Sequence, residues 1–234
     1  MSEIEGLVRA LREGDDATKV AAAKFLGTLA GSTANNAVIA EAGAIPPLVD
    51  LLRDGSAGAK RHAASALGYL AWATSRHDAS RILVAAAGAI PPLVRLLRDG
   101  SAEAKSEAVW ALRNLACGND TNQVLIAAAG GIPPLVDLLR DGSAEATELQ
   151  AAHALGNIAH NSDASAVAIA LAVGFEAVVE LARRGRVTVD NWDLVHDAGV
   201  PAKRKAALVV AALLGDCVPD SVPREIKGLI GPYL

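Results

Sequence analysis

Two asparagines, Asn114 and Asn157, lie at matching places in two similar stretches of sequence, ALRNLA and ALGNIA. A carboxamide carries both a donor and an acceptor, so one asparagine can pair with the N–H and the C=O of a single extended residue. Trp110 precedes Asn114 by one helical turn and could support an aliphatic or cationic side chain. We therefore predict a surface that binds an extended peptide. The alternatives are that both asparagines bond only to carbonyls of a neighbouring helix and that Trp110 fills the core.

Two further side chains belong to the same prediction. Tyr69 takes the place of the asparagine in the preceding copy of the pattern and would present a ring and a hydroxyl to a ligand. Arg113 follows Trp110 by three residues, so we expect it near the rim of the surface. Simple packing of Tyr69 and simple solvation of Arg113 are the alternatives.

A metal site is not expected. Cys117 and His160 occupy equivalent positions, and His153 precedes His160 by two turns. Zinc ligands must converge to about 2 Å from the ion, and no carboxylate is spaced to complete this set. The segment 186–200 contains other potential ligands, namely Asp190, Asp193, His196 and Asp197. They lack the regular alternation and the glycine of a calcium loop.

Composition and motifs also argue against several classes of function. We find no glycine-rich phosphate loop, GxSxG elbow or HExxH motif, so we expect neither an enzyme nor a cofactor. The formal net charge of −4 and the pI near 5.7 argue against a nucleic-acid partner. The apolar stretches are too short to span a membrane. The start has no signal-like apolar run, and the two cysteines lie far apart in the sequence. We therefore expect a reducing compartment, either the cytoplasm or the nucleus.

These side chains must be positioned by a repeated framework. The phrase IPPLVxLLRDGSA begins at Ile45, Ile90 and Ile132, and weaker copies begin near Ile4 and Phe175. Periods of this length indicate stacked helical repeats. With hydrophobic residues at 52% but aromatics at only 3%, the core must consist of Ala, Leu, Val and Ile. We expect a single solenoid domain over 1–234, with units of approximately 1–34, 35–78, 79–120, 121–163 and 164–216, an insertion at 186–200, and a capping helix at 220–231.

Each complete unit is predicted to contain three helices. A short first helix ends at a glycine suited to a left-handed cap. The second begins at paired prolines, where missing amide donors cost least. The sequence Asp-Gly-Ser then ends the second helix and caps the third through the serine oxygen. The expected third helices are 57–73, 102–117 and 144–160.

The motifs GAIPPLVxLL and AxxALxNLA, and above all the stretch EAVWALRNLA at 107–116, resemble the armadillo repeat. The resemblance covers nearly the whole chain outside the insertion and the cap. It implies an all-α, right-handed superhelical solenoid of about five repeats, with capping helices, whose third helices line a concave groove. In that family an asparagine grips the peptide main chain and a tryptophan one turn earlier forms a slot for side chains. The other units have Lys24, Ser65, His153 and Ala206 at the tryptophan position. The implied groove residues are Ser65, Tyr69, Trp110, Arg113, Asn114, His153 and Asn157.

The sequence therefore predicts a scaffold or adaptor that binds an extended segment of a partner protein. The alternative is a structural subunit of a larger assembly, which contacts its partners through its edges and the 186–200 insertion. We expect Trp192 to anchor that insertion against its unit. Its acidic residues, Asp190, Asp193 and Asp197, would then form an edge that prefers a basic partner.

Overall fold

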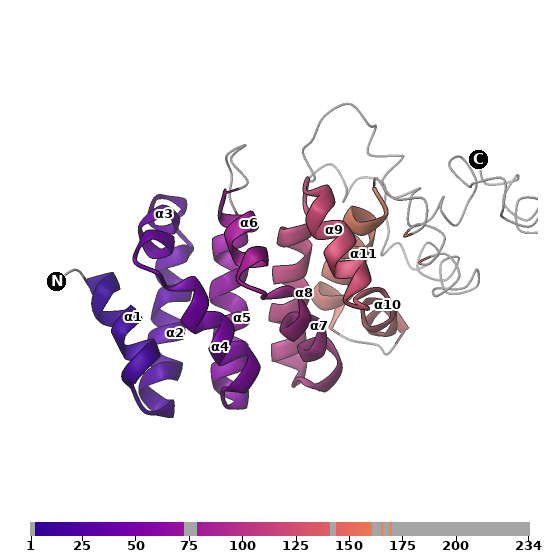
Figure 1. The fold of residues 1–234 in the computed structure, drawn as a ribbon. Coiled ribbons are helices and arrows are strands. Elements are labelled where there is room, and N and C mark those ends of the chain that lie inside the picture. The colour runs from indigo at the N-terminus through magenta and orange to yellow at the C-terminus, as the bar shows by residue number, and fades with distance from the viewer. Residues whose placement is uncertain (1–2, 73–78, 141–143, 161–164, 166–168, 170–234) are drawn as a thin grey trace, which may run out of the picture. The chain divides into compact units, whose positions relative to one another are not determined.

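The structure is a computed structural model that describes residues 3–72, 79–140 and 144–160, together with 165 and 169. These residues form eleven α-helices and contain no strand, so the all-α prediction is confirmed (Figure 1). The chain divides into two compact units, Met1–Leu115 and Ala116–Leu234. Most of the predicted fifth repeat, the 186–200 insertion and the 220–231 helix lie outside the described residues, and their structure stays a prediction.

The first unit begins with a pair of helices and continues with two sets of three. The pair is α1 (Glu3–Glu13) and α2 (Asp16–Ala30). The first set is α3 (Thr33–Glu41), α4 (Ile45–Asp54) and α5 (Ala57–Ala71). The second set is α6 (Ala79–Ala86), α7 (Ile90–Asp99) and α8 (Ala102–Ala116). The third helices α2 and α5 pack against each other, as the repeat pattern predicted.

The second unit has a third set of three helices. These are α9 (Asp120–Ala128), α10 (Ile132–Arg140) and α11 (Glu145–Ala159), and α11 packs on both of the others. Ile126, Leu135 and Leu155 have no exposed surface, so they form the core of this unit. Their counterparts in the first unit, such as Leu67 and Leu112, are equally buried, in agreement with the predicted core of Ala, Leu, Val and Ile.

Glycines end the short and the middle helices in two different ways. Gly43, Gly88 and Gly130 have φ of 75°, 82° and 74° and form the predicted left-handed caps of the first helices. Gly55, in the first Asp-Gly-Ser, has φ −70° and ψ 169°, which any residue can adopt. It is needed for space, because a Cβ at Gly55 would lie 2.6 Å from the carbonyl oxygen of Leu51.

Serine capping is confirmed for two of the third helices, α5 and α8. The Oγ atoms of Ser56 and Ser101 each accept a hydrogen bond at 3.3 Å, from the backbone N–H groups of Ala59 and Ala104 respectively. Ala144, at the N-cap position of α11, supplies no side-chain bond. Each serine satisfies one of the free amides in the first turn of its helix.

Polar side chains of the first helices cap the ends of the third helices, which the sequence did not predict. The last carbonyls of a helix lack partners within it. Arg81 of α6 donates from Nε to the carbonyl of Ala71 at 3.1 Å. In the second unit, the Gln123 amide donates to the carbonyl of Ala116 at 3.0 Å. The Arg81 bond ties α6 to the end of α5, the third helix that precedes it.

Among the described residues, no single helix is long and apolar enough to cross a membrane. Two pairs of consecutive helices, α6 with α7 and α9 with α10, are long and apolar enough only when the two helices are taken together, and each pair is sharply bent.

Candidate functional site

Three aromatic side chains meet where α5 and α8 approach each other. The ring centroids of Tyr69 and Trp110 lie 4.5 Å apart with the planes at 71°, an edge-to-face contact. The centroids of Trp72 and Trp110 lie 6.5 Å apart at 55°. We call these three residues the aromatic cluster. Trp110 is the member that neighbours both other rings, and it is half-buried.

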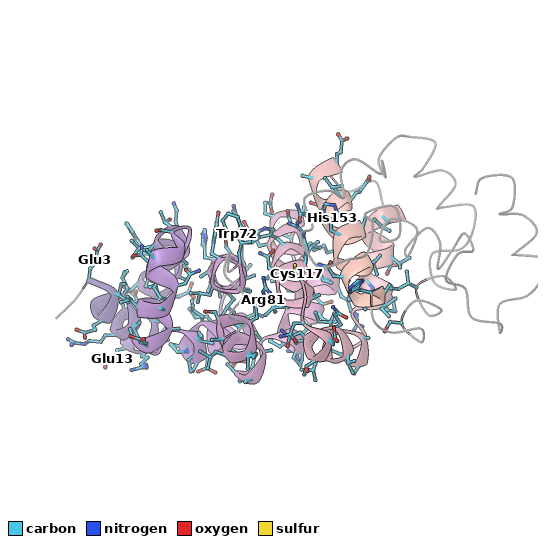
Figure 2. All side chains as sticks on the ribbon, turned by 90° about the horizontal axis from the view of Figure 1, so that it is seen from above. Glu3, Glu13, Trp72, Arg81, Cys117 and His153 are labelled. Atoms are coloured by element: carbon cyan, nitrogen blue, oxygen red, sulfur yellow. The ribbon has the colours of Figure 1, made fainter. Side chains whose placement is uncertain are left out.

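The cluster has an exposed part and an anchored part. Trp72, labelled in Figure 2, is 45% exposed and follows the last residue of α5. Trp110 packs on Gly68, where an added Cβ would lie 2.6 Å from its Cε3 atom. Trp110 is therefore both a packing residue and a surface residue. The two alternatives drawn from the sequence, a support for a ligand side chain and a core residue, are compatible.

Asn114 is fixed to the same glycine. Its side-chain amide donates to the carbonyl of Gly68 at 3.1 Å, and the residue is only 4% exposed. This is the bond to a neighbouring helix carbonyl that the sequence left open as the alternative. Contact between Asn114 and a partner main chain stays a prediction.

The other predicted groove residues are not members of the aromatic cluster. Arg113 on α8 is half-buried. His153 and Asn157 belong to the second unit, where they are 4% and 7% exposed on α11. Asp190, Trp192, Asp193 and Asp197 lie outside the described residues.

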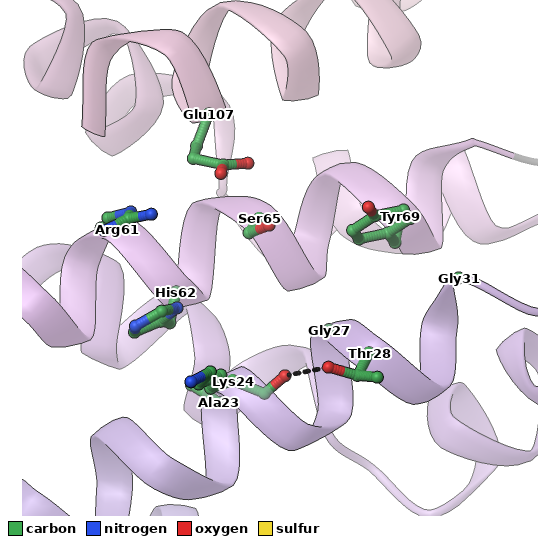
Figure 3. Close-up of a pocket in the computed structure, with 10 residues that line it drawn as sticks. All are labelled: Ala23, Lys24, Gly27, Thr28, Gly31, Arg61, His62, Ser65, Tyr69 and Glu107. Carbon is green, nitrogen blue, oxygen red and sulfur yellow. Dashed lines mark hydrogen bonds between the residues drawn. The ribbon is translucent and has the colours of Figure 1, made fainter. Parts of the chain in front are cut away.

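A pocket adjoins the aromatic cluster in the first unit. It has a volume of about 340 Å³ and lies along α2 and α5, with one contribution from α8 (Figure 3). We call it the α2–α5 pocket. It brings together Ser65 and Tyr69, two of the predicted groove residues, and Tyr69 thus belongs to both the pocket and the cluster. Its polar lining consists of Lys24, Thr28, Arg61, His62, Ser65, Tyr69 and Glu107.

The electrostatic character of this pocket is basic. Burial lowers the pKa of the half-buried His62, and the charges of Arg61 and Lys24 lower it further. Glu107 acts in the opposite direction. A lowered pKa means that His62 resists protonation, first because it is partly buried and second because Arg61 and Lys24 are positively charged.

The helical sets coincide with known repeats. The family model of the armadillo/β-catenin-like repeat matches residues 33–72, 77–117 and 119–160, together more than half of the chain. The chain belongs to the armadillo repeat family. Its fold is accordingly an armadillo-type helical solenoid, which is a protein-binding and non-catalytic class of scaffold.

Solved structures agree with this membership. An engineered protein has a TM-score of 0.73 and 31% identity, over 92% of this chain and 82% of its own. A designed armadillo repeat protein in complex with the peptide (KR)4 has a TM-score of 0.65 and 29% identity, over 99% of this chain and 87% of its own. Computationally designed armadillo repeat proteins for modular peptide recognition are similar, at 27% identity and a TM-score of 0.68, over 98% of this chain and 87% of that one. No curated protein matches the sequence closely enough to count as a relative.

Within this armadillo frame, sequence reasoning missed several residues of the candidate site. Trp72 lies three residues after Tyr69 but beyond the last residue of α5, so helical spacing gave no reliable signal for its direction. Arg61 and His62 precede Ser65 on the same helix, but their convergence with Lys24 depends on the packing of α2 against α5. No group of three or more potential metal ligands occurs within the described part of the chain.

Proposed function

We propose that this armadillo repeat protein binds an extended segment of a partner protein along its third helices, with the aromatic cluster as the main anchor. The single observation that carries the proposal is the exposed ring of Trp72 beside Trp110. Aromatic side chains dominate the energetics of protein interfaces because they bury a large area at a small cost in entropy. A tryptophan that is 45% exposed and already held by a second ring is well prepared for such contact.

The α2–α5 pocket supports the same proposal. Tyr69 lines the α2–α5 pocket and also contacts Trp110, so a ligand could contact both sites at once. A volume of about 340 Å³ is near the lower end of the range for ligand sites, which suits side chains of a peptide rather than a folded domain. An extended segment rises about 3.3 Å per residue, so alternate side chains could reach the cluster and the pocket.

Rigidity would favour this mode of binding. The third helices are tied together by the Asn114 bond to Gly68 and by the packing of Trp110 on that glycine. A surface that is already ordered loses little entropy when a peptide binds. The designed relative that holds the peptide (KR)4 is a precedent for peptide binding by this fold.

The test is to pan a display library of short random peptides against the full chain and against two variants. Trp72→Ala removes the exposed ring of the cluster and should abolish capture. Phe25→Ala removes a ring that is 58% exposed on α2 and is absent from both cluster and pocket, so it is the matched control. Both variants should keep the melting temperature of the parent. Equal capture by the Trp72→Ala variant would refute the proposal.

A second candidate function is that of a structural subunit, and the first helices favour it. Val38 of α3 and Leu83 of α6 lie at matching positions and are 46% and 49% exposed, and Ile82 beside Leu83 is 54% exposed. Contiguous exposed apolar residues often mark contact sites. A subunit of this kind should form stoichiometric, salt-resistant complexes that Ile82→Ser with Leu83→Ser disrupts and Trp72→Ala does not. A contribution of the 186–200 insertion to such contacts stays a prediction.

A further inference from the structure

The α2–α5 pocket gathers hydrogen-bond donors and positive charge from two helices. Lys24 comes from α2, and Arg61 and His62 come from α5 (Figure 3). Within the described part of the chain, neither Lys24 nor Arg61 forms a salt bridge. Glu107 of α8 is the single carboxylate of the lining. The lining therefore contains two permanent positive charges and a titratable third, against one negative charge.

The remaining polar groups of the pocket also suit an anion. The hydroxyls of Ser65 and Tyr69 can donate to an oxygen, and an ammonium and a guanidinium can only donate. Thr28 is already engaged, because its Oγ1 donates to the carbonyl of Lys24 at 3.1 Å. Charge-assisted bonds from lysine and arginine to carboxylate or phosphate are among the strongest that side chains make.

We propose that the α2–α5 pocket selects an acidic side chain of the bound segment, either a carboxylate or a phosphate. This inference rests on the proposed function and specifies which partner segments fit. The preference is opposite to that of the designed relative, which holds the basic peptide (KR)4. It is also local, since a formal net charge of −4 gives the whole chain no general attraction for anions.

His62 gives the pocket a pH-dependent response. It is faced by Lys24 from α2, by Arg61 from α5 and by Glu107 from α8. Burial and the two cations hold the pKa of free His62 below its ordinary value of 6.5. A bound anion stabilises the protonated ring and raises that pKa. The affinity for an acidic peptide should therefore increase as pH falls through the pKa of the complex, and it should level off below the pKa of the free protein.

The test compares peptides selected from the same random display library by the full-length protein and by two charge-reversed variants. Lys24→Glu with Arg61→Glu reverses the pocket. Lys60→Glu with Arg95→Glu is the matched control, because it changes the net charge equally at residues that line a different hollow of about 200 Å³. We expect the parent and the control to enrich aspartate and glutamate, and the pocket variant to lose this enrichment.

Binding measurements with individual peptides then show how much affinity the pocket contributes and which acidic group it accepts. A selected peptide should bind the pocket variant about tenfold more weakly than the control variant, as expected for two partly exposed ion pairs. Replacement of its key glutamate by phosphoserine should retain binding, and replacement by alanine should not. The His62 ring signals in NMR should titrate at higher pH when the glutamate peptide is bound.

The possible outcomes separate the two proposals. If no peptide is captured by any form of the protein, the proposed function fails and this inference fails with it. If peptides are captured through Trp72 but are neutral or basic, or if acidic enrichment survives in the pocket variant or is lost equally in the control, only the acidic preference fails. If phosphoserine binds and glutamate does not, the pocket is a phosphate site, which is the second of the two anions proposed.

Discussion

The six-membered ring of Trp110 packs on the backbone of Gly68, with its Cε3 and Cζ3 atoms 2.6 Å and 2.7 Å from the point where a Cβ would be placed. The carbonyl of that glycine also accepts a hydrogen bond from the Asn114 side-chain amide at 3.1 Å. One residue without a side chain therefore positions both members of the motif that the sequence had singled out. The geometry of the aromatic cluster depends on this glycine.

Replacement of Gly68 by alanine should displace the Trp110 ring. We expect a loss of about 1–3 kcal/mol of unfolding free energy, typical of an overpacked contact, and a changed near-UV circular dichroism spectrum. Gly58 provides a control in the same helix, because the nearest atom to its added Cβ is 3.9 Å away. Gly58→Ala should be neutral or slightly stabilising. Equal effects of the two substitutions would show that Trp110 does not rest on Gly68.

Asn114→Ala should destabilise the protein even when no partner is present. The substitution removes a buried hydrogen bond, which costs about 0.5–1.5 kcal/mol, because the carbonyl of Gly68 keeps the Trp72 backbone N–H as a donor at 3.0 Å. Thr28 is at the matching position of α2 but is exposed and bonds only to its own helix. Thr28→Ala should therefore change the unfolding free energy by less than about 0.5 kcal/mol. Chemical denaturation measures both changes. If the Asn114→Ala variant is as stable as the parent, the bond to Gly68 does not stabilise the fold, and ligand binding becomes the main role of this residue.

Gly43 should be intolerant of a side chain for two reasons. Its φ of 75° disfavours L-residues by about 1–2 kcal/mol. An added Cβ would also lie 3.1 Å from Nη2 of Arg12, which donates to the Gly43 carbonyl at 3.2 Å. Gly43→Ala should lower the thermal midpoint. Gly6→Ala, with no atom within 4 Å of the added Cβ, should not lower it. A double-mutant cycle with Arg12→Ala measures how much of the loss passes through the arginine.

The N-cap of α2 should make part of the stability dependent on pH. The Asp15 side chain accepts a hydrogen bond from the Thr18 backbone N–H at 2.8 Å. Hydrogen bonding with Thr18, through its side chain first and its backbone second, lowers the pKa of Asp15 from 3.8. Because the folded pKa is the lower one, this contribution is complete above the unfolded value and is lost as pH falls through the folded value.

Asp15→Asn separates this titration from the cap itself. Asparagine retains an acceptor for the cap but does not titrate. Thermal melts should therefore show a smaller loss of stability between about pH 6 and about pH 3 in the variant than in the parent. Identical acid profiles would mean that the Asp15 carboxylate contributes nothing to folding.

The sequence predicted the helical framework well because its signals are local. The paired prolines, the Asp-Gly-Ser links and the glycine caps each act within a few residues, and the structure confirms them at Ile45–Asp54 and at Gly43. The orientation of Asn114 could not be predicted in the same way. Helical periodicity places it on a face, but its bond to Gly68 depends on how closely the next helix approaches.

The candidate site was only partly predictable for a related reason. Trp72 follows the end of α5 with φ −82° and ψ 66°, so helical periodicity does not describe its direction. The α2–α5 pocket combines Lys24 with Arg61 and His62. Lys24 precedes these two residues by 37 or more positions in the sequence. Their convergence follows from the packing of α2 against α5, and no local pattern contains that information.

Titration of a selected peptide into protein labelled with ¹⁵N at the tryptophan indoles tests the central claim most directly. The chain has three tryptophans, Trp72, Trp110 and Trp192, and single Trp→Phe variants would assign their indole signals. The proposed function predicts that the Trp72 and Trp110 signals shift together and saturate at the concentration at which binding saturates. A peptide that binds the full chain while both signals keep their positions would contradict the claim that the aromatic cluster is the anchor.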